Sequence, residues 1–333
     1  MQKIFIGIDM SKASLDLCVR NSEIVLEELK LSNTISELNK FFKKFLKEYN
    51  QSAFLVCCEF TGHYTYPLCF VCEDLGIDLW LASPYQIKHS CGLVRGKTDK
   101  IDSRRIADYA FRFQDKCRLY SLPDKKLASL KVLVSERDLY VSHKIALQGQ
   151  LTDQKNFMSA MDYSRKSKRL KGLLKGLDKN ISTIDKEIEK FINNDATLSN
   201  QHKLLTSVDG VGTITAAKMI AVTNAFKNFD DARSFCCYAG VAPFEYTSGS
   251  SVHSKRKVSH KADKSIKSIL HMAAMSVLRM KNSELKKYFD RKVAEGKNKM
   301  LVLNAIRGKL ILRMFAVIKQ NRTFDKNYQH AVA

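Results

Sequence analysis

Four acidic residues in the first third of the chain stand at the ends of predicted strands and at the start of a predicted helix. Asp9 and Glu59 each close a short apolar run, and Asp99 and Asp102 open a helical segment. Their spacing places the last two carboxylates on one helix face. Carboxylates that converge from several elements can hold two divalent ions about 3.5–4 Å apart, which activate the attacking oxygen and stabilise the leaving one in phosphodiester chemistry. The set therefore predicts a metal-dependent site.

Each acidic residue also has a structural explanation when it is taken alone. Asp9 could cap a turn, Glu59 could end an exposed strand, and Asp99 could be the N-cap of its helix. The occurrence of all four in this order, each in a suitable local context, favours the metal site.

A second candidate for chemistry is a group of serines, Ser248, Ser250 and Ser251, in a glycine-containing loop before a basic stretch. The cations of that stretch are His253, Lys255, Arg256, Lys257, His260, Lys261, Lys264 and Lys267. A serine that attacks a phosphodiester keeps the bond energy in a serine ester, and nearby cations stabilise the charge of the transition state. From the residues alone, a flexible polar loop with a phosphate-binding face explains the segment better.

Two further segments suit contacts with phosphate. Gly210 and Gly212 resemble the turn of a helix-hairpin-helix, in which the next helix presents free N–H groups, although a simple tight turn fits equally well. A basic run, predicted to lie between two long helices, is either a solvated helix end or a phosphate contact. This run contains Arg165, Lys166, Lys168 and Arg169.

The elements that must position these residues fall into three regions. Residues 1–122 are predicted to be an α/β domain in the order three strands, helix, strand, helix, strand, helix, which matches the RNase H-like order. Neighbouring first and fourth strands would bring Asp9 and Glu59 together. Residues 123–198 are predicted to be two long helices, a coiled-coil or oligomerisation region or an ordinary bundle. Residues 199–333 are predicted to be a helical domain that carries the serine loop.

The coiled-coil prediction rests on a row of apolar residues at three- and four-residue steps. They are Leu170, Leu173, Leu177, Ile181, Ile184, Ile188 and Phe191.

The composition bounds the partners and the compartment. The chain has 333 residues, enough for about two domains, and a formal net charge of +22, which favours a polyanionic partner over a basic surface without one. Its nine cysteines, some in adjacent pairs, fit buried reduced thiols. We find no signal peptide and no apolar run of about 18 residues, so we expect a protein of the cytosol or nucleoid without a membrane span.

Three segments resemble the DEDD transposases of bacterial insertion sequences (insertion-sequence family one-ten). They are GIDMSK at 7–12, CCEFTGHY at 57–64 and KTDKIDSRRIADYA at 97–110. The resemblance extends over about residues 3–320. It implies a RuvC-like N-terminal domain in which Asp9, Glu59, Asp99 and Asp102 bind Mg²⁺ or Mn²⁺.

The segment after Pro243 resembles the family's second block, a proline followed by a Ser-Gly pair and a basic helix start. The serine nucleophile of the family falls on Ser248, with Ser250 and Ser251 left open. This chain has Lys261-Ala262-Asp263 and Lys267 where relatives usually have a Lys-Arg-Gly-like turn and an arginine, and Asp209 where they often have proline. These departures affect the phosphate contacts that would be assigned to this chain by matching its positions to those of the family.

The resemblance also implies a structured non-coding bridge RNA that pairs with donor and target DNA, while the protein reads backbone and shape. We expect a homo-oligomer, a dimer or tetramer, whose serine and acidic sites are brought together by folding or across subunits. Three alternatives stay open. They are a RuvC-type junction nuclease with a metal-activated water, a non-enzymatic nucleic-acid-binding protein, and an actin-like or sugar-kinase ATPase, which the lack of glycine-rich phosphate loops disfavours.

Overall fold

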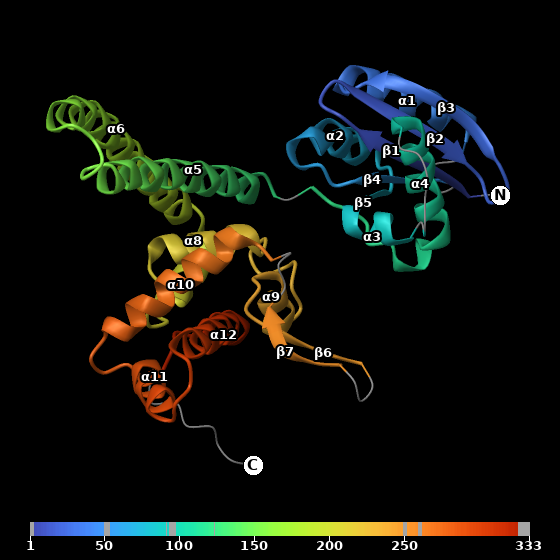
Figure 1. Cartoon of the computed structure of the whole chain (residues 1–333). Helices are drawn as coiled ribbons and strands as arrows, with labels where there is room; N and C mark the ends of the chain where they lie inside the picture. The colour runs from blue at the N-terminus through green and yellow to red at the C-terminus, as the bar shows by residue number, and fades with distance from the viewer. Residues whose placement is uncertain are drawn as a thin grey trace, which may run out of the picture. The chain divides into compact units, whose positions relative to one another are not determined.

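The computed structural model describes residues 3–49, 54–90, 92, 98–122, 124–248, 252–258 and 262–325, with the backbone alone at 246–248 and 252–257. These residues belong to two compact units, 1–122 and 123–333, which are described separately here (Figure 1).

The first unit is built on a five-stranded sheet in the order β3-β2-β1-β4-β5. Its strands are β1 (Ile4–Met10), β2 (Ser14–Arg20), β3 (Val25–Ser32), β4 (Phe54–Glu59) and β5 (Leu79–Ala82). The first three strands are antiparallel, whereas β1, β4 and β5 run parallel. This confirms the predicted RNase H-like order, with β1 beside β4.

Helices cover both faces of this sheet, because β1 and β4 are apolar at nearly every position and cannot face water on either side. One face packs against α1 (Ile35–Glu48) and α2 (Tyr66–Leu75), with the short η2 (Gly62–Thr65) before α2. The other packs against α3 (Pro84–Ser90) and α4 (Asp99–Arg112), which the η3 turn (Gln114–Lys116) follows.

Gly7 determines how closely α4 approaches the sheet. A Cβ atom at Gly7 would lie 2.2 Å from the Ala107 nitrogen and 2.4 Å from the Ser103 carbonyl oxygen. Only glycine allows the helix backbone to cross β1 at this distance. The first turn of α4 is therefore held near the ends of β1 and β4.

The second unit is mainly helical, as predicted. Its helices are α5 (Lys125–Asp153), α6 (Ala160–Asn193), α7 (Ala196–Thr206), α8 (Thr213–Val222), α9 (Ala232–Tyr238), α10 (Lys264–Arg279), α11 (Glu284–Ala294) and α12 (Lys299–Gln320). The buried α8 contributes to one core with α7, α9, α10 and α12.

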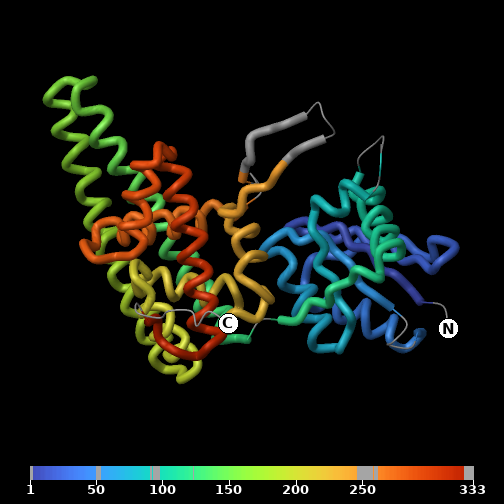
Figure 2. The backbone as a smooth tube through the Cα atoms, turned by 90° about the horizontal axis from the view of Figure 1, so that it is seen from below, coloured from blue at the N-terminus to red at the C-terminus, as the bar shows by residue number. Residues whose placement is uncertain are grey.

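Helices α5 and α6 form an antiparallel hairpin whose far end projects from the rest of this unit in both views (Figures 1 and 2). Near the body, Ile184 and Ile188 of the predicted apolar row are buried in the common core. Farther out, Leu173 of the same row is 59% exposed. The row is thus a core seam at one end and an open apolar surface at the other.

The serine segment departs from the predicted loop in a helical domain. The strands β6 (Pro243–Ser248) and β7 (Val252–Val258) form an antiparallel pair. Aromatic and β-branched residues such as Phe244, Tyr246 and Thr247 favour strands over helices, and a proline is tolerated at a strand's first position.

No helix in the described part of the chain is long and apolar enough to cross a membrane.

Candidate active site

The four predicted acidic residues lie where the sheet and α4 meet. Asp9 is near the end of β1 and Glu59 ends β4, and these two strands are parallel neighbours with Ile8 opposite Cys58. Asp99 and Asp102 lie in the first turn of α4. Because parallel strands end at the same edge of a sheet, the fold brings the strand ends and the start of the helix to one region.

Thr98, rather than Asp99, caps this helix. Its hydroxyl accepts a hydrogen bond from the Ile101 N–H at 3.3 Å. The structural explanation of Asp99 as an N-cap is therefore wrong, and its carboxylate is not used in capping.

The electrostatics of Asp9 show that the three other carboxylates lie close enough to act on it. Burial and, to a lesser extent, the charges of Asp102, Asp99 and Glu59 together raise the pKa of Asp9 to about 6, against a lowering by the hydrogen bond from the Met10 N–H. A carboxylate surrounded by other carboxylates resists ionisation. The region therefore gathers four carboxylates, of which Asp102 pairs with Arg105 at 2.7 Å, and an added cation would lower the cost of ionising Asp9.

Ion pairs that were not predicted fix α4 over the sheet. Arg104 and Lys100 on α4 both pair with Glu28 on β3, and these bonds lower the pKa of Glu28 to about 2. Arg20 on β2 pairs with Asp108 on the same helix. These ion pairs could not be predicted from the spacing of residues, because the partners lie far apart in the sequence.

The serine site is described by its backbone. Ser248 is the last residue of β6 and pairs with Val252, while Lys255, Arg256 and Lys257 lie in β7. These three basic residues thus belong to a strand instead of the expected helix start, since α10 begins only at Lys264. Ser250, Ser251 and Lys261 lie outside the described residues.

The two glycines of the predicted helix-hairpin-helix turn, between α7 and α8, have different roles. Gly210 has φ +85°, and a Cβ there would lie 2.2 Å from the Val277 side chain, so both conformation and packing require glycine. Gly212 is the N-cap of α8, and a Cβ there would meet nothing within 4 Å. A phosphate contact at Gly212 stays a prediction.

The basic run was placed incorrectly between the two long helices. Arg165, Lys166, Lys168 and Arg169 lie within the first turns of α6. Good helix-forming residues extend this helix toward its N-terminus, where the Ser159 hydroxyl accepts from the Asp162 N–H. Three of the four are exposed, and Lys166 donates to the Gln150 side chain of α5 at 3.2 Å.

Two models of known protein families match this chain. A model described as "Transposase", of the DEDD type of IS110, matches residues 6–155, and one described as "Transposase IS116/IS110/IS902 family" matches residues 202–290. The two models together match more than two thirds of the chain.

The chain belongs to the IS110 family of transposases.

Similar proteins agree with this assignment. The transposase is 27% identical to the "Pilin gene-inverting protein" of Moraxella lacunata over 98% of this chain and 99% of that one. It is 29% identical to the "Transposase for insertion sequence element IS1533" of Leptospira borgpetersenii over 32% of this chain and 30% of that one. The protein is a DNA transposase or recombinase, and the ATPase and non-enzymatic alternatives are wrong.

A solved structure, T. thermophilus RuvC in complex with Holliday junction substrate, matches 35% of this chain and 99% of its own at 12% identity. The TM-score of 0.27 is too low to carry an argument. The RNase H-like assignment rests on the strand order of the first unit.

A DEDD-type family implies a divalent metal cofactor. The carboxylates of the transposase are of the chemical type that binds such an ion. Carboxylate oxygens are the ligands that Mg²⁺ and Mn²⁺ prefer, and burial together with the neighbouring carboxylates raises the pKa of Asp9, although Asp102 is already paired with Arg105 at 2.7 Å. Among the described residues, no three acidic, histidine or cysteine side chains stand close enough together to form a complete metal-binding group. The carboxylates thus face one region without converging on a single point.

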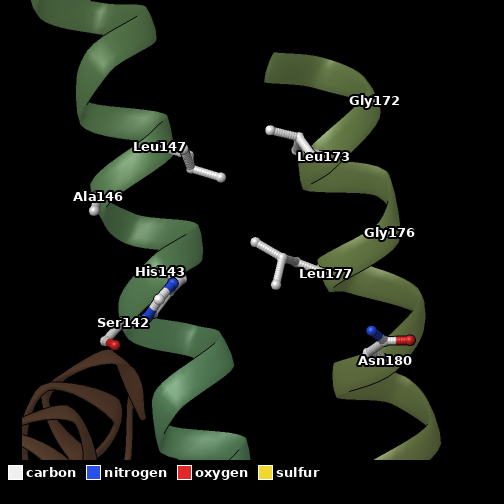
Figure 3. Close-up of a pocket in the computed structure, with 9 residues that line it drawn as sticks. All are labelled: Ser142, His143, Ala146, Leu147, Gly172, Leu173, Gly176, Leu177 and Asn180. Atoms are coloured by element: carbon white, nitrogen blue, oxygen red, sulfur yellow. The ribbon is translucent and has the colours of Figure 1, made fainter. Parts of the chain in front are cut away.

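A pocket of about 650 Å³ lies between α5 and α6 of the transposase, and no carboxylate that the structure describes lines it (Figure 3). Leu147, Leu173 and Leu177 point into the space between the two helices, and Gly172 and Gly176 leave it unfilled. With His143 as its one titratable lining residue, this pocket is an apolar surface and not a second catalytic site.

Proposed function

We propose that the transposase cleaves and rejoins DNA through a covalent link to Ser248, in a reaction that depends on a divalent ion, Mg²⁺ or Mn²⁺, held by Asp9, Glu59, Asp99 and Asp102. The observation that carries the metal-dependent part is the position of the four carboxylates at the ends of β1 and β4 and in the first turn of α4; burial and the charges of the other three raise the pKa of Asp9. The serine part is supported by family membership and by the Ser-Gly block.

In this proposal, the Ser248 hydroxyl oxygen attacks a DNA phosphorus and gives up its proton. The bond from that phosphorus to the leaving oxygen breaks, and the leaving oxygen takes up a proton. The serine phosphodiester keeps the energy of the broken bond, so a hydroxyl of another strand can displace the serine and rejoin the DNA. When bound, a divalent ion supplies stabilisation of the negative charge that develops on the oxygens.

The proposed partners are DNA and a bridge RNA that supplies sequence specificity. The net charge of +22 supports a polyanionic partner, and Gly212 and the exposed cations of α6 are proposed phosphate contacts. We also propose a homo-oligomer formed through the outer part of the α5–α6 hairpin. Its exposed apolar residues support this, among them Leu139, Ile145, Met161 and Leu173.

Circular-junction formation by an element that carries this gene and its flanking DNA tests the proposal. Junctions and a covalent protein–DNA band should form with the wild type, and neither with Asp9→Ala or Ser248→Ala. The exposed Asp74 on α2 provides a control, because Asp74→Ala removes a charge of the same unit outside the acidic region. An undiminished covalent band with Ser248→Ala would contradict the assignment and point to Ser250 or Ser251.

A RuvC-type nuclease with a metal-activated water is the second candidate, favoured by the acidic region alone. It requires Asp9 but not Ser248. Cleavage without any covalent band, lost in Asp9→Ala and retained when Ser248, Ser250 and Ser251 are all alanine, would establish it.

A further inference from the structure

A pocket of about 1380 Å³ lies at the base of the β6–β7 hairpin, wholly within the second unit. It is bounded by α9, α10, α12 and the two ends of the hairpin, where Pro243 and Val258 are paired. Figure 1 shows this hairpin leaving the helical body beside α9. The walls are mostly apolar, whereas Arg233, Lys267 and Arg307 bring positive charge to the lining.

Arg307 on α12 is an unusual residue to find in this wall. It is only 5% exposed, and none of the described carboxylates pairs with it. Its Nη2 lies 2.7 Å from Nδ1 of His271, its Nη1 donates to Oδ1 of Asn304 at 3.4 Å, and its Nε has no partner. A buried guanidinium with unused donors and no counter-charge is strongly unfavourable in a protein interior.

The neighbours of Arg307 cannot neutralise it. Burial and the charge of Arg307 lower the pKa of His271, so the histidine stays neutral and offers Nδ1 as an acceptor. Asn304 is held by a bond from its Nδ2 to the Val241 carbonyl at 2.7 Å. Both side chains orient the guanidinium without supplying negative charge.

Lys218 of the same unit shows what a paired buried cation looks like. It is 4% exposed, as deeply buried as Arg307, and it forms an ion pair with Asp138 of α5. The fold therefore supplies a carboxylate for one buried cation and leaves the other open toward a pocket. The missing charge at Arg307 is one that a ligand could supply.

We propose that this pocket binds a backbone phosphate of the DNA strand on which the hairpin acts, with Arg307 as its principal ligand. Phosphate matches the guanidinium fork and its unused donors, and Lys267 and Arg233 add charge to the lining. The apolar walls, which include Val241, Pro243 and Leu301, accommodate the sugar or base beside that phosphate. The inference rests on the proposed function, since the pocket is built on the hairpin that carries Ser248.

Arg307→Met tests the proposal, with Arg279→Met as a control of equal charge change at the exposed end of α10. The measurements are the Tm of the free full-length protein and its affinity, at several salt concentrations, for DNA duplexes of the element ends. Arg307→Met should keep or raise the Tm, because it removes a buried unpaired charge. It should weaken DNA binding about tenfold and reduce the salt slope by about one, whereas Arg279→Met changes affinity less than about twofold.

A DNA affinity equal to that of the wild type in Arg307→Met would overturn the proposal, as would a loss confined to RNA. If Arg307→Met does not fold, the DNA affinity of Lys267→Met, a variant of the same pocket, tests the phosphate site instead. A loss of DNA affinity of about threefold or more is then expected, and an unchanged affinity refutes the phosphate site.

These readouts do not depend on strand exchange. A wild type that forms a Ser248 adduct, with Arg307→Met binding DNA normally, would refute the pocket alone. A wild type that forms no adduct, with DNA binding lost in Arg307→Met, would refute the serine mechanism alone.

Discussion

Asp9 of the first unit is half-buried beside other carboxylates, whereas Arg307 of the second unit is buried beside neutral partners. In the first region burial and neighbouring like charges raise the pKa of Asp9, and one of those charges, Asp102, pairs with Arg105. In the second a single cation is enclosed by helices and lacks a counter-ion. In our proposals, ligands of opposite sign complete the two regions, a metal cation in the first and a DNA phosphate in the second.

The largest effect should come from removing one charge of the acidic region. Asp102→Asn preserves the side-chain volume but removes a carboxylate that acts on Asp9, and we expect DNA cleavage to fall at least about 100-fold. Cleavage of a labelled element end at saturating Mg²⁺ measures this. Asp74→Asn should cleave normally, and full activity in Asp102→Asn would show that the acidic region is not the metal site.

Displacing α4 should break the same region without changing any charge. Gly7→Ala places a methyl group 2.2 Å from the helix backbone, so we expect a loss of unfolding free energy of about 1–3 kcal/mol together with reduced cleavage. Urea unfolding measures the stability. Gly149→Ala in α5 is the matched control, because nothing lies within 4 Å of its Cβ and alanine favours a helix, so it should be neutral or stabilising.

The pH dependence of stability should distinguish the acidic region from the rest of the fold. The pKa of Asp9 rises from 3.8 to about 6 on folding, so ionised Asp9 destabilises the fold fully above about pH 6. This destabilisation should shrink as the pH falls from 6 toward 3.8, and Asp9→Asn should remove it. Unfolding of both proteins in EDTA between pH 4 and 8 tests this, and parallel profiles would contradict it.

Added Mg²⁺ at 100 times its Kd should raise the unfolding free energy of the wild type at neutral pH by about 2.7 kcal/mol. It should raise the unfolding free energy of Asp9→Asn by less. Urea unfolding with and without Mg²⁺ measures both changes, and equal gains would contradict a metal site at Asp9.

The smallest effect concerns the ion pairs that hold α4. Glu28→Gln should lower the unfolding free energy by no more than about 1 kcal/mol, because Lys100 and Arg104 are largely exposed. The pKa of Glu28 is lowered to about 2, so its contribution is present above about pH 4.5 and is lost as the pH falls toward 2. Chemical unfolding at pH 7 and pH 3 measures the difference, and an effect that grows at pH 3 would refute it.

Most of the first unit could be predicted because its strands are short apolar runs separated by polar turns. Asp9 and Glu59 could be found for the same reason, since each ends such a run. The β6–β7 hairpin was missed because a short serine- and glycine-containing segment beside many cations resembles a loop. The basic run of α6 was misplaced because charged residues alone do not mark where a helix begins.

The order of the strands, the acidic residues at their ends and the positive net charge were determined by the sequence, because alternation, apolar runs and composition are local properties. Only the tertiary structure decided that α4 crosses β1 at Gly7, that Glu28 meets Arg104, and that Arg307 contacts His271 without a carboxylate. Each depends on side chains far apart in the chain and on which face of each helix is buried. Packing fixes these features, and no spacing along the sequence records them.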